Sequence, residues 1–276
     1  MEWRKIKTII ILILLLVNGF LLVIVGARWG EVRRYEQSAL TQSVQVLENN
    51  GITVDSRSLS GAERLVGSTV ERSIPAEQGL VAALLGAEVS VRNQGGGLYS
   101  YASGDSWATF RVGGQIEARL AEEDRWVTSD PEDFALRLAE EMGLTVRVTD
   151  SELENGTGTV VLCQEREGMP VYSCRLRFLF DGGRLTQLSG TLAVGEESPV
   201  GEQEVLSLPT ALLRFLDEVL AGGDICSAVT AMEPGYQAVR VLGGGLRMEP
   251  VWLISTDTAD YYMDAVTGEL SRLTGE

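Results

Sequence analysis

The chain of 276 residues contains no histidine, and its two lysines, Lys5 and Lys7, lie at the extreme N-terminus. The missing histidine excludes Ser-His-Asp and Cys-His nucleophile activation and histidine-bearing zinc sites. The missing lysine excludes a Ser-Lys dyad from the rest of the chain. The tetrapeptide Gly-Asp-Ser-Trp at 104–107 therefore only superficially resembles a serine-hydrolase motif, because no side chain is available to take the proton from Ser106. We interpret it as a hairpin turn.

Cysteine is also scarce, with three residues in the whole chain, Cys163, Cys174 and Cys226. Their spacing forms no CxxC motif or metal-ligand pattern, and one thiol is left over if two of them pair. We interpret them as small core residues, and we expect neither a bound metal nor a cofactor. Cys163 and Cys174 flank a predicted turn, and they would form a disulfide only if the strand register places them opposite each other.

Positive charge is in deficit, because 23 Lys and Arg residues face 39 Asp and Glu residues, which gives a formal net charge of −16. A surface this acidic repels phosphate backbones. We therefore expect no nucleic-acid partner, and we interpret the charge as a source of solubility.

The many carboxylates leave one class of catalysis open. Asp-Thr-Ala at 257–259 resembles half of an aspartic-protease dyad, but no second loop is present to share its proton, so we interpret it as a β-turn. Glu122, Glu123 and Asp124 are candidates for a glycosidase pair, although a cluster in a polar connection is typically a solvated surface. We expect a protein that is not an enzyme, with a carboxylate-dependent envelope hydrolase as an alternative.

One long uncharged run is present, from Thr8 to Ala27. Its 20 residues would extend about 30 Å as an α-helix, which is the thickness of a bilayer core. This run predicts a transmembrane helix, flanked by Trp3 and Trp29 as candidate membrane-interface residues. A cleaved signal peptide is the alternative, but its apolar region would be unusually long. Cations are evenly matched on the two sides, so they do not decide the orientation.

Within this run, Asn18 and Gly19 interrupt the aliphatic sequence. A polar amide beside a small residue suits close helix–helix contact in a bilayer, which is worth roughly 1 kcal/mol. The pair is a candidate contact with a membrane partner, although a lone asparagine can also be tolerated without one.

Three amphipathic helices are predicted, at 31–50, 129–143 and 208–223. The second and third are each followed by short, β-rich segments separated by turns. Pro170-Val171-Tyr172 and Pro250-Val251-Trp252 lie at similar distances from the two helix starts, so we expect them to begin equivalent strands. The predicted fold class is α+β, with two repeated modules of a helix on an antiparallel meander, or three if the hairpins at 96–120 belong to a further one.

Three segments resemble the YycH/YycI family of membrane-anchored regulators of Gram-positive bacteria. They are "MEWRKIKTIIILILLLVNGFLL" at the start, "QEREGMPVYSCRLRF" in the middle and "MEPVWLISTDTADYYMDAVTGEL" near the end. The last segment is also similar to PepSY-type domains, which recur in many secreted proteins.

We divide the chain into an N-terminus (1–7), a transmembrane helix (8–27), a first α+β region (28–126), a second helix-meander module (127–200) and a third, PepSY-like module (201–276). The resemblance implies that the N-terminus is short and cytoplasmic, and that an extracytoplasmic portion of two α+β modules follows the membrane helix. It implies a cell-membrane protein that acts with a sensor histidine kinase of a two-component system for cell-wall metabolism, and with a paralogous regulator. The alternative is a PepSY-like extracytoplasmic module that binds and restrains an envelope hydrolase.

Overall fold

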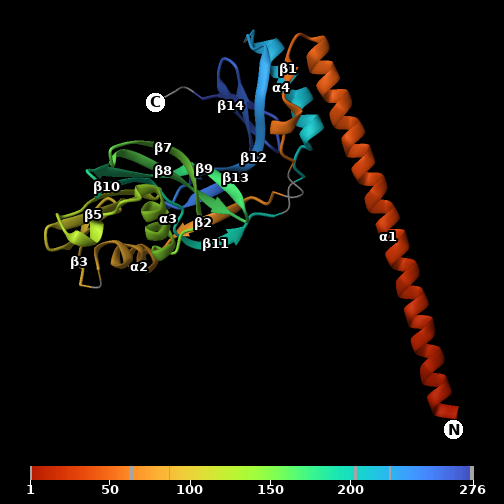
Figure 1. The fold of residues 1–276 in the computed structure, drawn as a ribbon, viewed down its shortest axis with the longest axis horizontal. Helices are drawn as coiled ribbons and strands as arrows, with labels where there is room; N and C mark the ends of the chain where they lie inside the picture. Colours follow the sequence, from red (N-terminus) through yellow and green to blue (C-terminus); the bar gives the residue numbers. More distant parts are fainter. Residues whose placement is uncertain (1, 62–64, 87, 202–203, 224, 274–276) are drawn as a thin grey trace.

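The computed structural model describes residues 2–61, 65–86, 88–201, 204–223 and 225–273 (Figure 1). Side chains at 2–6, 8–13, 23–34 and 124 lie outside that description. The helices are α1 (Glu2–Asn49), α2 (Ile74–Leu85), α3 (Pro131–Glu141) and α4 (Leu208–Gly222), with short 3-10 helices at Ser56–Ser58 and Asp124–Trp126. The strands are β1 (Thr53–Val54), β2 (Ser68–Arg72), β3 (Ser90–Gly95), β4 (Leu98–Ser103), β5 (Ser106–Arg111), β6 (Gln115–Arg119), β7 (Val146–Glu154), β8 (Thr157–Arg166), β9 (Met169–Asp181), β10 (Arg184–Thr191), β11 (Gly195–Pro199), β12 (Ala228–Arg240), β13 (Leu246–Thr256), β14 (Asp260–Asp264) and β15 (Leu270–Arg272).

The predicted mixed α+β architecture with a largely antiparallel sheet is confirmed. Each of α2, α3 and α4 is followed by four consecutive strands that pair antiparallel in chain order, β3 to β6, β7 to β10 and β12 to β15. Helix α2 is not among the helices that the sequence pattern predicts. Its start carries the usual signals, because the Ser73 hydroxyl accepts a hydrogen bond from the Ala76 amide and proline occupies the first turn.

The two prolines do not begin equivalent strands, so that prediction is wrong. Pro170 is the second residue of β9, the third strand after α3, whereas Pro250 is the fifth residue of β13, the second strand after α4. At the edge of β13 that faces away from β12, residues 246–248 pair with β2 and the residues from Val251 onward pair with β14. The missing N–H of proline therefore falls where β13 changes its neighbour and no ladder bond is lost.

Strands β3 to β10 form one eight-strand sheet in the order β7-β8-β9-β10-β6-β5-β4-β3, with every pair antiparallel. Helices α2 and α3 both contribute to the core on one face of this sheet, through residues such as Leu84 and Leu138, which pack with Phe110 and Phe178. The remaining strands gather around β12 and β13, and the two parts meet where Tyr236 of β12 pairs in parallel with Val171 of β9. The opposite face of the eight-strand sheet carries neither α2 nor α3.

Helix α1 is continuous over 48 residues, which corresponds to about 72 Å at 1.5 Å per residue. Figure 1 shows it as a straight rod that reaches the body of the molecule at its C-terminal end, beside α4. There Leu47 is fully buried and packs with Leu212 and Phe215 of α4, while Leu40 and Val44 lie against the same cluster. The helix ends at Asn49, two residues before Gly51, whose φ of 84° suits the end of a helix.

Among the described residues, no helix is long and apolar enough to cross a membrane. Most of the predicted transmembrane segment lies outside the described side chains, at 8–13 and 23–27, and the segment stays a prediction.

Candidate functional site

The face of the eight-strand sheet that carries neither α2 nor α3, called the helix-free face below, has two adjacent surface hollows. Successive residues of a strand point to opposite faces. Ala108 and Phe110 of β5 and Ile116 and Ala118 of β6 enter the core, so the residues between them point to the helix-free face.

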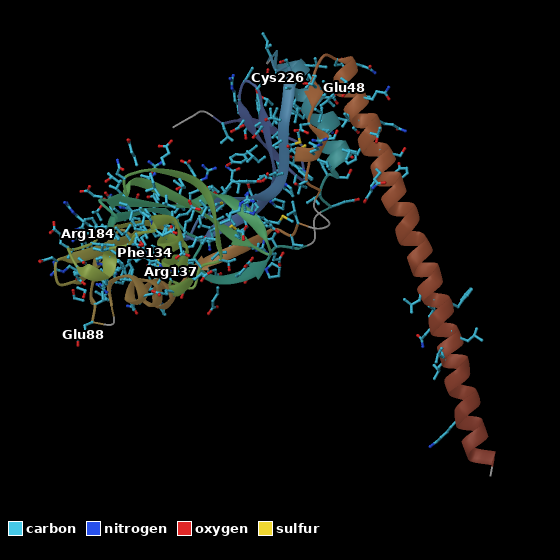
Figure 2. The ribbon with its side chains drawn as sticks, viewed as in Figure 1. Glu48, Glu88, Phe134, Arg137, Arg184 and Cys226 are labelled. Carbon is cyan, nitrogen blue, oxygen red and sulfur yellow. The ribbon has the colours of Figure 1, made fainter. Side chains whose placement is uncertain are left out.

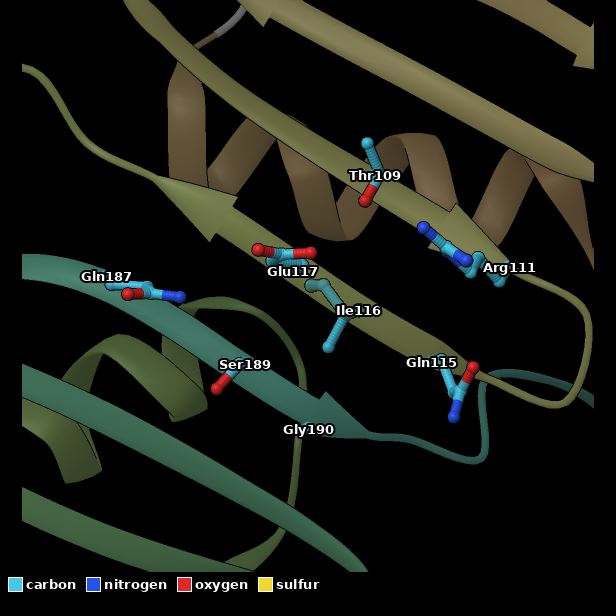
Figure 3. Close-up of a pocket in the computed structure, with 8 residues that line it drawn as sticks. All are labelled: Thr109, Arg111, Gln115, Ile116, Glu117, Gln187, Ser189 and Gly190. Atoms are coloured by element: carbon cyan, nitrogen blue, oxygen red, sulfur yellow. The ribbon is translucent and has the colours of Figure 1, made fainter.

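Two hollows lie side by side on this face. The first has a volume of about 280 Å³ and is lined by Thr109, Arg111, Gln115, Ile116, Glu117, Gln187, Ser189 and Gly190 (Figure 3). The second has a volume of about 400 Å³ and is lined by Trp107, Glu117, Arg119, Leu179, Thr186 and Gln187. Because both include Glu117 and Gln187, we describe them together as the trough. It follows β6, with β5 on one side and β10 on the other.

The strand register explains why the surface is hollow. One cross-strand row consists of the large side chains Trp107, Arg119, Gln187 and Leu179. The next row has the short side chains of Thr109 and Ser189 on either side of Glu117, and Figure 3 shows these three residues on adjacent strands. Short residues in the middle of a surface lined by longer ones leave a depression.

The polar side chains of the trough have few partners within the protein. Arg111, Arg119 and Glu117 are exposed. Arg177 of β9 is also exposed, and it lies opposite Ser189 of β10 in the strand register, at the edge of the trough. In the described part of the chain, none of these four residues forms an ion pair or a side-chain hydrogen bond. By contrast, Arg137 of α3 pairs with Asp133 and Arg184 of β10 pairs with Glu122. Figure 2 labels both of these arginines.

The trough is therefore locally positive in a strongly acidic chain, with three arginines around one glutamate. Guanidinium groups bind carboxylates through paired, charge-assisted hydrogen bonds. Trp107 and Leu179 add apolar surface at one end. This arrangement suits binding of an anionic ligand, and it includes none of the nucleophile–base pairs that covalent catalysis requires.

A second cluster of charged side chains is buried behind the other face. Arg72 at the end of β2 donates from Nε to Oε1 of Glu77 in α2 at 2.5 Å, and from a second nitrogen to Oε2 at 3.0 Å. Glu77 is only 2% exposed. The Tyr101 hydroxyl donates to the same carboxylate at 3.4 Å, and burial raises the pKa of Tyr101 to about 12. These contacts, together with a hydrogen bond from Arg72 to the Gly97 carbonyl, join β2, α2 and β4, so we interpret the cluster as structural.

The predicted membrane contact is partly described. The Asn18 side chain donates to the Leu14 carbonyl at 2.9 Å, within α1. A methyl group added at Gly19 would meet no described atom within 4 Å, so this side of the helix is open. The side chains of Trp3 and Trp29 lie outside the described residues.

The two motifs that we interpreted as turns have structural roles. Ser106 is buried at the β4–β5 turn, and its hydroxyl accepts a hydrogen bond from the Ala121 amide at 2.8 Å. Asp257 accepts hydrogen bonds from the Ser227 hydroxyl at 2.6 Å and from the Ser227 and Ala228 amides, which lowers its pKa. It fastens the start of β12 to the turn after β13.

The described side chains of the acidic cluster after β6, Glu122 and Glu123, lie on the solvated surface. Glu122 is 93% exposed and pairs with Arg184, and Glu123 pairs with Arg125. The side chain of Asp124 lies outside the described residues.

Of the three cysteines that we interpret as core residues, Cys163 and Cys174 are buried and form no disulfide, whereas Cys226 is only half-buried. Cys163 of β8 is paired with Arg175 of β9 rather than with Cys174. An offset of one residue turns the two thiols toward opposite faces of the sheet, so they are not placed for a disulfide.

The solved structures that are similar to this chain include the following two. A crystal structure at 1.45 Å of an uncharacterized protein from Eubacterium rectale ATCC 33656 has a TM-score of 0.46 at 13% identity, over 81% of this chain and 90% of that one. The C-terminal domain of Bacillus megaterium YpeB has a TM-score of 0.37 at 14% identity, over 75% of this chain and 100% of that one. No protein-family model and no curated protein matches the sequence. Membership of the YycH/YycI family stays a prediction.

Proposed function

We propose that this protein is a non-enzymatic, single-pass accessory protein that regulates a membrane partner, namely a sensor histidine kinase linked to cell-wall metabolism. In this proposal, residues 8–27 cross the membrane with the N-terminus in the cytoplasm, and the sheets lie outside. The kinase and the cell-wall link come from the sequence resemblance to YycH/YycI proteins.

The continuity of α1 is the observation that carries this proposal. One helix includes Asn18 and Gly19 in its N-terminal half and Leu47, buried against α4, near its C-terminal end. A helix docked in a core transmits displacement and rotation better than a flexible linker would. A change in the folded part would therefore reach the helix surface at Asn18.

Replacing residues 8–27 with an unrelated membrane helix tests the proposal. The replacement retains the anchor and removes the contact surface, so we expect kinase-dependent gene expression to become the same as in a deletion strain. A chimera that regulates as well as the wild type would contradict regulation through the membrane.

A second candidate is an extracytoplasmic binding module that restrains an envelope hydrolase, as PepSY-type domains suggest. The trough favours it, because Arg111, Arg119 and Glu117 are exposed and form no ion pair or side-chain hydrogen bond in the described protein. The same chimera separates the two candidates, since a module that binds through its folded part would keep its activity on any anchor.

A further inference from the structure

The trough has a charge pattern with a defined spacing. At one end of the trough, Arg111 of β5 lies opposite Gln115 of β6 in the strand register. Arg119 lies at the other end, four residues after Gln115 along β6. At about 3.3 Å per residue, the two guanidinium-bearing positions are offset by about 13 Å along the strands and by one inter-strand distance across them. Glu117 lies midway, between Thr109 and Ser189.

An extended polypeptide has the same repeat. Its side chains at positions i, i+2 and i+4 point to one side, and i and i+4 are about 13 Å apart. Acidic residues at i and i+4 would meet Arg111 and Arg119. The residue at i+2 would face Glu117, which repels an acid and attracts a cation.

The polar and apolar neighbours fit a polypeptide better than a uniformly charged polymer. Gln115 and Gln187 each carry an amide that can both donate to and accept from a peptide backbone. Trp107 and Leu179 provide apolar contact at the Arg119 end. A polyphosphate chain would place negative charge beside Glu117 and leave these apolar surfaces unused.

We propose that the trough binds an extended acidic polypeptide segment with the pattern acid-x-base-x-acid. Arg111 and Arg119 bind the two carboxylates, and Glu117 selects the residue between them. Arg177 adds positive potential from the β9 side. This binding site is independent of the membrane segment and goes beyond the regulatory function proposed above.

The test uses the full chain in a nonionic detergent and a fluorescent peptide that contains Glu-Gly-Lys-Gly-Glu. Anisotropy should show binding that weakens with added salt. The double substitution R111Q/R119Q should weaken binding by about tenfold or more, because two charge-assisted contacts are lost. R137Q is the matched control, since Arg137 lies on α3, and it should bind like the wild type.

A second peptide of the same composition, with its two glutamates adjacent, tests the spacing and should bind more weakly. E117Q should raise the affinity for a peptide with glutamate in the central position. Thermal unfolding of each variant shows whether its fold is retained.

Several outcomes would overturn the proposal. They are no binding by the wild type, equal binding by R111Q/R119Q with its fold retained, equal binding of the two peptides, and competition by inorganic polyphosphate as strong as by the peptide at equal charge. Self-association that R111Q/R119Q abolishes would identify a second copy of the chain as the occupant instead.

Discussion

The half-buried Arg72 and the buried Glu77 form an ion pair that joins the end of β2 to the first turn of α2. The guanidinium donates to both carboxylate oxygens, and it also donates to the Gly97 carbonyl at 2.5 Å. The pair thereby connects the β12-centred strands, which β2 joins, to the eight-strand sheet, which α2 covers. Removing Glu77 leaves the half-buried guanidinium of Arg72 with the Gly97 carbonyl but without its charged partner.

Glu77→Ala should therefore lower the free energy of unfolding by about 3 to 5 kcal/mol. Asp133→Ala is the control, because it breaks the exposed pair with Arg137 and should cost less than about 1 kcal/mol. Urea denaturation of both variants measures the difference. Equal, small losses would show that the buried pair does not stabilise the fold.

Stability should fall in alkaline solution, and Tyr101 should account for part of the fall. Burial, with Glu77 nearby, raises its pKa from 10.0 to about 12. Between these two pH values the unfolded chain loses the tyrosine proton while the folded protein keeps it, so the free energy of unfolding decreases as pH rises. The contribution is fully present below pH 10.

Tyr101→Phe should make the decrease between pH 10 and 12 shallower. Some decrease should remain, because burial also raises the pKa of Tyr172, Tyr236 and Tyr262. Melting temperatures of both proteins across this pH range provide the measurement. Identical slopes would argue against a role for Tyr101.

The thiols should differ in their reactivity with a disulfide reagent such as DTNB. Cys163 and Cys174 are buried, and burial raises the pKa of Cys163 and raises that of Cys174 to about 12. Both will react slowly in the native protein, since the thiolate is the reacting form. Cys226 is only half-buried and should react first.

In guanidinium chloride without a reductant, all three thiols should titrate. A count of one thiol under these conditions would reveal a disulfide and contradict the register of β8 and β9. C226S should remove the fast phase in the native protein.

Gly114, at the β5–β6 turn beside the trough, should not tolerate a side chain. Its φ is 74°, and an added Cβ would lie 1.9 Å from the Leu192 carbonyl oxygen, which the backbone cannot easily move. Gly114→Ala should cost roughly 2 to 4 kcal/mol, from the backbone strain and this clash together. Gly104→Ala is the control, because its φ is 57° but no described atom lies within 4 Å of the new Cβ.

Thermal unfolding should show a clearly smaller loss for Gly104→Ala, of about 1 kcal/mol. If both variants lose the same stability, the contact with Leu192 has no energetic role.

Local signals allowed much of the fold to be predicted from the sequence. Helix α3 begins at Pro131 after a cap at Asp130 and α4 begins beside Pro209, and both have one apolar face. Helix α2 was missed because it is apolar on most sides, with Glu77 buried, so no helical period distinguishes a core face. Pro250 was misplaced because proline usually marks a strand end, and only the change of neighbour along β13 permits it in the interior.

The trough could not be found from local patterns. The alternation in β5 and β6 indicates which of their side chains share a face. The pairing of β6 with β10 is long-range, however, and joins residues about seventy positions apart. No local feature of the sequence specifies that register, so Gln187 and Ser189 could not be placed beside Glu117.

Photo-crosslinking from position 18 in living cells tests the regulatory proposal most directly. A photoreactive amino acid at Asn18 should form an adduct with a membrane helix of a sensor histidine kinase, identified by mass spectrometry. The same amino acid at Leu16, about 200° around the helix, is the control and should not form it. A kinase adduct from position 18 alone is the result we predict. Repeated absence of any kinase adduct from position 18, with the protein present in the membrane, would contradict the account.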